Sequence, residues 1–184
     1  MYRLACILCC LILPLTAQDT LYVSNQGSGT ISVIDLGSRQ TITTLTVGIY
    51  PGKITLSPDG SIGYVLNTFS GNISVIDISS NTISTTISVG SFPQFVTFSL
   101  DGSTAYVSDG GVDAVSVIDV NSSTVVGTIP VGPSPTNMAL SSDGSFIYVA
   151  NTLGESVSVI NTQTNQVVAT LTLGNFPNNI LLIP

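Results

Sequence analysis

Side chains that could perform chemistry are scarce in this 184-residue chain. The sequence contains no histidine, a single glutamate (Glu155), and cysteine only at Cys6, Cys9 and Cys10. Nucleophile–base pairs and histidine-bound zinc or copper centres therefore lack the residue types they usually need. Catalysis would depend on Asp, Ser, Thr, Tyr or Lys53, which form no cluster beyond what a repeat generates. We predict no catalytic residue, no metal site and no cofactor.

Aspartates recur at two fixed positions. The first set is Asp35, Asp77 and Asp119, and the second is Asp59, Asp101 and Asp143. A calcium loop would place several carboxylates close together along the chain, whereas these lie one repeat apart. An aspartate beside a turn accepts hydrogen bonds from backbone N–H groups. We therefore expect both sets to stabilise turns.

The sequence repeats with a period of 42 residues, without insertion or deletion, in four copies. Tyr-Val pairs stand at 22–23, 64–65, 106–107 and 148–149, and a proline recurs at Pro51, Pro93, Pro135 and Pro177. In the second copy, β-branched runs separated by turn residues predict strands over 53–57, 62–67, 73–78 and 82–89. Four short strands in each repeat of about 42 residues are typical of a propeller blade. We predict an all-β fold, a β-propeller of four four-stranded blades.

The repeat also resembles a known family. Tyr-Val-Ser-Asn at 22–25, Tyr-Val-Leu-Asn at 64–67 and Tyr-Val-Ala-Asn at 148–151 look like the signature of the YVTN β-propeller repeat family, as does Ser-Pro-Asp-Gly at 57–60. The third copy departs from it with Tyr-Val-Ser-Asp at 106–109. The resemblance implies an extracytoplasmic or cell-surface propeller.

The repeats begin on a second strand (21–25) and end after an inner strand (179–183). The last strand could therefore complete the first blade and close a four-bladed ring. The alternatives are a partial propeller, a vestigial fragment, or a homodimer of eight blades, because an open arc exposes apolar faces and strand edges. The expected core consists of Val23, Val33, Val65, Val75, Val107, Val117, Val149 and Val159.

Residues 1–17 resemble a signal peptide, with Arg3, an apolar run and a Leu-Thr-Ala site before Gln18. Residues 18–184 would then form the repeat domain, with copies at about 19–52, 53–94, 95–136 and 137–184. Cleavage would leave two basic and ten acidic side chains, a formal charge of −8. Nucleic-acid binding needs clustered Lys and Arg and is excluded. No second apolar run could span a membrane, so we expect a secreted protein of the periplasm or cell surface.

Residues that depart from the repeat are the candidates for binding. Strand directions place the second-to-third and outer-to-inner loops on one face, which we call the loop face, and the Asp-Gly turns on the other. The loop face carries aromatic and acidic side chains suited to binding a protein or glycan partner: Tyr50, Phe69, Phe92, Phe176, Asp109, Asp113 and Glu155. The rings could instead pack between blades.

Lys53 is a further candidate, because it lies on an inner strand where the other copies have Phe95, Asn137 and Asn179. Such positions could line a central channel, where a lysine could bind an anionic ligand. Three functions remain open: a binding or scaffold module, a propeller enzyme resembling lactone hydrolases or quinone-dependent dehydrogenases, and a structural propeller fragment. The shortage of basic and histidine side chains favours the first.

Overall fold

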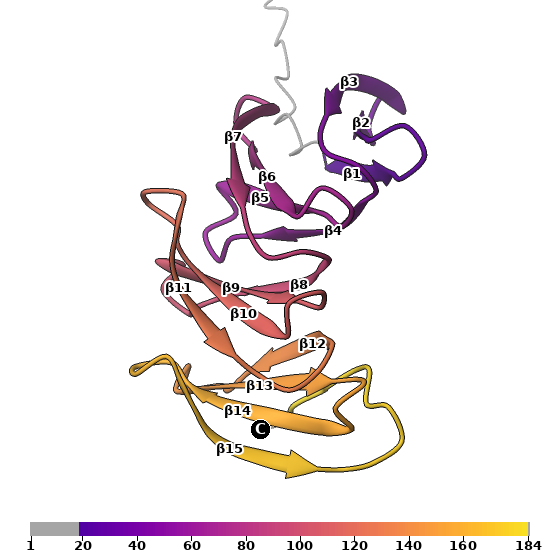
Figure 1. Ribbon diagram of the computed structural model, residues 1–184. Coiled ribbons are helices and arrows are strands. Elements are labelled where there is room, and N and C mark those ends of the chain that lie inside the picture. Colours follow the sequence, from indigo (N-terminus) through magenta and orange to yellow (C-terminus); the bar gives the residue numbers. More distant parts are fainter. Residues whose placement is uncertain (1–18, 184) are drawn as a thin grey trace, which may run out of the picture.

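The computed structural model describes residues 19–183, so the expected leader lies outside the described residues. These residues form four antiparallel sheets that follow one another along an open arc (Figure 1). The first sheet contains β1 (Thr20–Asn25), β2 (Thr30–Asp35) and β3 (Gln40–Thr46). The second contains β4 (Pro51–Leu56), β5 (Ile62–Asn67), β6 (Asn72–Asp77) and β7 (Thr82–Ser88).

The third sheet contains β8 (Pro93–Phe98), β9 (Thr104–Asp109), β10 (Ala114–Asp119) and β11 (Thr124–Pro130). The fourth contains β12 (Pro135–Leu140), β13 (Phe146–Asn151), β14 (Ser156–Asn161) and β15 (Gln166–Thr172). Within each sheet, each strand pairs with the next one in the sequence, as in a propeller blade. The predicted all-β propeller is confirmed, and the strands begin and end within two residues of those predicted for the second copy. Among residues 19–183, no helix is long and apolar enough to cross a membrane.

The Asp-Gly turns join the inner strand of a blade to the second strand. Gly60 adopts a φ of 73°, a left-handed conformation that is easiest for glycine. The carboxylate of Asp59 accepts hydrogen bonds from Ser57 Oγ at 2.5 Å and from the backbone N–H of Ser61 at 3.1 Å. The same pattern recurs at Asp101 and Asp143. These aspartates stabilise turns, as predicted.

The other aspartate set follows the third strands. The carboxylates of Asp35, Asp77 and Asp119 accept hydrogen bonds from the backbone N–H groups of Ser38, Ser80 and Ser122. Their partners lie three residues further along, in the turn that leads to the outer strand. The predicted stabilisation of these turns is therefore confirmed as well.

The core lies between the blades, in three separate apolar clusters. Each cluster joins the second, third and outer strands of one blade to the inner, second and third strands of the next. Seven of the eight predicted core valines are buried. Val23 is the exception and is 37% exposed, because its side of the first sheet has no preceding blade to pack on.

The C-terminal segment 177–183 is not paired with β1, so the first sheet has three strands and the described chain is an open, partial propeller. Thr152 Oγ1 donates a hydrogen bond to the carbonyl oxygen of Pro177 at 2.8 Å. Thr68 makes the equivalent bond to Pro93, the first residue of β8. The segment after Pro177 therefore starts where the inner strand of a following blade would start.

Candidate functional site

Three aromatic side chains gather on the loop face. The Tyr50 and Phe69 rings are stacked, with centroids 4.7 Å apart, and Phe92 meets Phe69 edge-on at 5.8 Å. Tyr50 and Phe92 belong to outer-to-inner loops, and Phe69 belongs to the loop between β5 and β6. The three side chains are between 41% and 58% exposed, so they pack on one another without being buried between blades. We call them the aromatic cluster.

The backbone under this cluster has an unusual conformation. Tyr50 and Phe92 have φ angles of 57° and 53°, and Ser134 has 53° at the same repeat position. Left-handed backbone is uncommon for residues other than glycine and costs about 1–3 kcal/mol. The carbonyl oxygens of Tyr50 and Phe92 accept hydrogen bonds from Thr68 N and Gly110 N, which hold these turns in place. The turn geometry thus belongs to every blade, and aromatic side chains occupy it in only some of them.

The other loop-face candidates are not all part of this cluster. Phe176 is 60% exposed and has a φ of 47°, but it makes no ring contact with the three other aromatic side chains. Asp113 is exposed, and its Oδ1 accepts a hydrogen bond from Ser134 N at 2.8 Å. Glu155 is also exposed, and its carbonyl oxygen accepts hydrogen bonds from Leu173 N and Gly174 N.

Asp109 does not belong to an exposed acidic rim, which corrects the expectation from the sequence. Its side chain is fully buried, and Ser116 Oγ donates to its Oδ2 at 2.5 Å. The other carboxylate oxygen has no hydrogen-bond partner among the described residues. Burial raises the pKa of Asp109 to about 6, and the bond from Ser116 opposes this only in part. It occupies the site where the second and fourth copies bury an asparagine, Asn67 and Asn151.

Lys53 lies on the inner side of the arc. Its Nζ is 3.5 Å from the centroid of the Phe95 ring, within the range of a cation–π interaction. Partial burial lowers the pKa of Lys53 from its usual value. Phe95 also lines a cavity of about 300 Å³ whose other walls are Gln94, Thr136, Asn137, Asn178 and Asn179. The three residues predicted to share the repeat position of Lys53 along a channel are Phe95, Asn137 and Asn179. All three line this cavity.

Bulges explain why neighbouring residues line this cavity. The pairing of β8 with β9 shifts between Pro93 and Phe95, and that of β12 with β13 shifts between Pro135 and Met138. A bulge interrupts the alternation of side chains along a strand and re-aims them. Gln94 and Thr136 were not predicted from the sequence. In a strand with regular alternation, the side chain of Gln94 would point away from that of Phe95, and the side chain of Thr136 away from that of Asn137.

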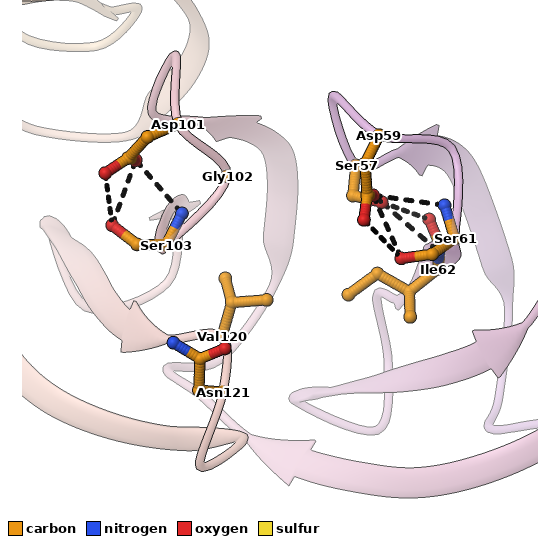
Figure 2. Close-up of a pocket in the computed structure, with 9 residues that line it drawn as sticks. All are labelled: Ser57, Asp59, Ser61, Ile62, Asp101, Gly102, Ser103, Val120 and Asn121. Carbon is orange, nitrogen blue, oxygen red and sulfur yellow. Dashed lines mark hydrogen bonds between the residues drawn. The ribbon is translucent and has the colours of Figure 1, made fainter.

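A second cavity, of about 420 Å³, lies on the opposite face between two Asp-Gly turns (Figure 2). Asp59 and Asp101 line it from neighbouring blades, together with Asn121. Hydrogen bonds, chiefly from Ser57 Oγ, lower the pKa of Asp59 to about 2. Each carboxylate already accepts hydrogen bonds from serine residues of its own turn, as the dashed lines in Figure 2 show. Within residues 19–183, no three His, Cys, Asp or Glu side chains are placed to hold a metal ion together.

The chain belongs to the lactonase, seven-bladed β-propeller family, whose sequence pattern matches residues 82–175. No curated protein matches the sequence.

Among solved structures, the chain is similar to Kuenenia stuttgartiensis hydrazine synthase, with 28% identity and a TM-score of 0.76 over 84% of this chain. It is also similar to a functionally unknown protein from Desulfotomaculum acetoxidans DSM 771, with 19% identity and a TM-score of 0.71 over 87% of this chain. The chain spans 46% and 56% of the length of these two structures, about half of each. These likenesses support the propeller fold, and they leave the function of this chain to be proposed.

Proposed function

We propose that this protein is a secreted or cell-surface binding module that recognises a protein or carbohydrate partner through the aromatic cluster of its loop face. The observation that carries this proposal is the exposure of Tyr50, Phe69 and Phe92 as one cluster, in which Tyr50 and Phe92 have left-handed backbone. Exposed aromatic side chains on preformed loops supply large contact area at a small cost in entropy. They are also enriched among the residues that dominate binding energy.

The negative net charge of the chain limits the kind of partner. The chain has three basic side chains against ten acidic ones, so an anionic polymer would be repelled. A neutral glycan or the uncharged surface of a protein meets no such penalty. Asp113 and Glu155 lie on the same face and provide acceptors for hydroxyl or amide donors.

The test is binding of the purified chain to a panel of neutral polysaccharides and cell-surface proteins, followed by substitution of the aromatic cluster. Phe69→Ala and Phe92→Ala should each weaken binding at least tenfold, which corresponds to about 1.4 kcal/mol. Leu100→Ala is the matched control, because Leu100 is as exposed as Phe69 but lies beside Gly144, in an Asp-Gly turn on the other face. Equal losses for all three variants would contradict the proposal.

Hydrolysis of a lactone is the second candidate, and the family match favours it. The cavity beside Lys53 is the place to look, because its amide side chains could hold a sugar lactone. None of its lining residues is a carboxylate or histidine that could activate water. Acid release from a panel of sugar lactones tests this candidate: a rate above background that Lys53→Met abolishes would favour it over the binding module.

A further inference from the structure

A cavity of about 290 Å³ lies beside the aromatic cluster on the loop face. One wall is the loop between β1 and β2, which contributes Gln26 and Gly27. The other wall is the end of β3 and the loop after it, which contribute Thr46 and Tyr50. The Tyr50 ring also stacks on Phe69 of the cluster. The cavity and the aromatic cluster are therefore continuous through this one side chain.

The repeat explains why a cavity lies there. Gly27 stands one repeat before Phe69, and Tyr50 stands one repeat before Phe92. In the second blade, the Phe69 ring meets the Phe92 ring, with centroids 5.8 Å apart. In the first blade, the glycine has no side chain to meet Tyr50, and none of the described atoms lies within 4 Å of a Cβ added to Gly27. The cavity thus lies where the second blade has an aromatic ring.

The residues that line the cavity suit a sugar. None of them is charged. Gln26 and Thr46 are exposed, and their amide and hydroxyl groups can donate as well as accept hydrogen bonds. Val47 and Ile49 are the apolar residues of the lining. A sugar ring needs both kinds of neighbour, because its edge carries hydroxyl groups and its faces carry C–H groups.

The exposed carboxylates of the loop face lie in other blades. One repeat position has left-handed backbone in every blade and is occupied in turn by Gly29, Gly71, Asp113 and Glu155. The carboxylates thus belong to the third and fourth blades, whereas the cavity lies in the first blade and at its connection to the second. A basic protein would gain most beside the carboxylates. A neutral ligand gains nothing from them and fits the uncharged cavity.

We propose that the cavity and the aromatic cluster form one elongated binding site for a neutral polysaccharide. The cavity holds one sugar unit, and the rings of Tyr50, Phe69 and Phe92 support the units that follow. This inference rests on the proposed binding function and selects carbohydrate over protein as the partner. Aromatic rings present flat apolar faces that the C–H groups of a sugar ring can cover. The hydrogen-bonded turns already hold Tyr50 and Phe92 in place, so binding requires little further ordering.

Isothermal titration calorimetry with soluble hexasaccharides tests the inference. The neutral probes are chains of glucose, xylose or mannose, and hexagalacturonate is the anionic comparison. At least one neutral hexasaccharide should bind, and it should bind at least about tenfold more tightly than its own disaccharide, because the site extends over several sugar units. Hexagalacturonate should bind at least about tenfold more weakly, because the chain is acidic and the cavity offers no cation.

Gly27→Phe is the decisive variant, because it gives the first blade the residue of the second and fills the cavity. It should weaken binding of the hexasaccharide at least about tenfold, while its melting temperature stays near that of the parent. Gly27→Ala is the matched control, since it adds one methyl group and should leave the affinity within about twofold. Gln26→Leu keeps the size of the side chain without its amide and should weaken binding about threefold or more.

The outcomes separate this inference from the proposed function. If Phe69→Ala weakens binding of a neutral hexasaccharide but Gly27→Phe does not, the cluster binds and the cavity takes no part, which overturns the inference alone. A protein that binds through the cluster, when no neutral hexasaccharide binds, has the same meaning. Tighter binding of hexagalacturonate overturns the inference as well. Binding of a neutral hexasaccharide that neither variant changes contradicts both the inference and the proposed function.

Discussion

At the scale of single residues, Asp109 is the clearest departure from the repeat. The other three copies have asparagine there, and in two of them the amide is fully buried: Asn67 Nδ2 donates to Ser74 Oγ and Asn151 Nδ2 to Ser158 Oγ, each at 2.9 Å. In the third copy the hydrogen bond runs in the opposite direction, from Ser116 Oγ to Asp109 Oδ2, because an ionised carboxylate can only accept a hydrogen bond. A buried carboxyl with one unpartnered oxygen is costly when it is ionised.

The raised pKa of Asp109 predicts how stability depends on pH. Below pH 4 the carboxyl is protonated in both the folded and the unfolded chain. Between pH 4 and its folded pKa of about 6, only the unfolded chain releases the proton, so the free energy of unfolding falls as pH rises. Asp109→Asn removes this loss and should stabilise the protein at pH 7.5 by up to about 3 kcal/mol.

Urea unfolding of the parent and of Asp109→Asn at pH 4 and pH 7.5 checks this prediction. Asp113→Asn is the control, because Asp113 is exposed and should leave the difference between the two pH values unchanged. A parent chain that is equally stable at both pH values would contradict a buried Asp109.

At the scale of elements, the blades are joined by close contacts that only small residues permit. A Cβ atom added to Gly132, in the loop before β12, would lie 2.6 Å from Asn151 Nδ2 and 2.9 Å from its Cβ. Asn151 is fully buried and bound to Ser156 and Ser158, so it cannot move aside cheaply. The glycine recurs here because the loop passes directly over the end of the second strand.

Gly132→Ala should therefore lower the free energy of unfolding by about 1–3 kcal/mol, the usual cost of overpacking. Gly27→Ala should change it by less than about 0.5 kcal/mol, because nothing lies within 4 Å of the added Cβ. Thermal and urea unfolding measure both variants. A neutral Gly132→Ala would contradict this close approach of the loop to Asn151.

At the scale of the whole molecule, stability depends on contacts between blades, since each blade is a thin sheet with an apolar surface on both sides. Val117 illustrates this, because it is 2% exposed and packs in the cluster that joins the third and fourth blades. Quasi-repetitive proteins of this kind gain stability from each interface between neighbouring units. Loss of this interface should separate the fourth blade from the other three.

Val117→Asp should abolish the cooperative melt, because burying an unpaired charge costs several kcal/mol, a large part of the total stability of a domain. Val126→Asp, on the exposed face of the adjacent strand, should melt close to the parent. Circular dichroism during heating measures both. A cooperative melt near the parent value for Val117→Asp would contradict the blade register.

Period and residue type by themselves determined the fold class, the strands and the turn aspartates, because strand propensity, turn chemistry and a 42-residue repeat are local properties of the sequence. They also determined that Tyr50, Phe69 and Phe92 belong to one face, since strand direction alternates regularly. The contact among these three rings, and the left-handed backbone of Tyr50 and Phe92, required the tertiary structure, because loop conformation decides where side chains point.

Only the tertiary structure decided in which copies a given repeat position is buried. Val23 and Val65 occupy the same repeat position, each after a tyrosine, yet one is exposed and the other is buried, because burial depends on a neighbouring blade and not on the strand itself. The same holds for Asp109. The local sequence places it at the end of a strand, but only the packing of Gly90 and Ser116 around it shows that it lies inside the protein. The bulge in β8 likewise turned the side chains of Gln94 and Phe95 into the same cavity. A bulge changes the direction of side chains without a clear signal in the sequence.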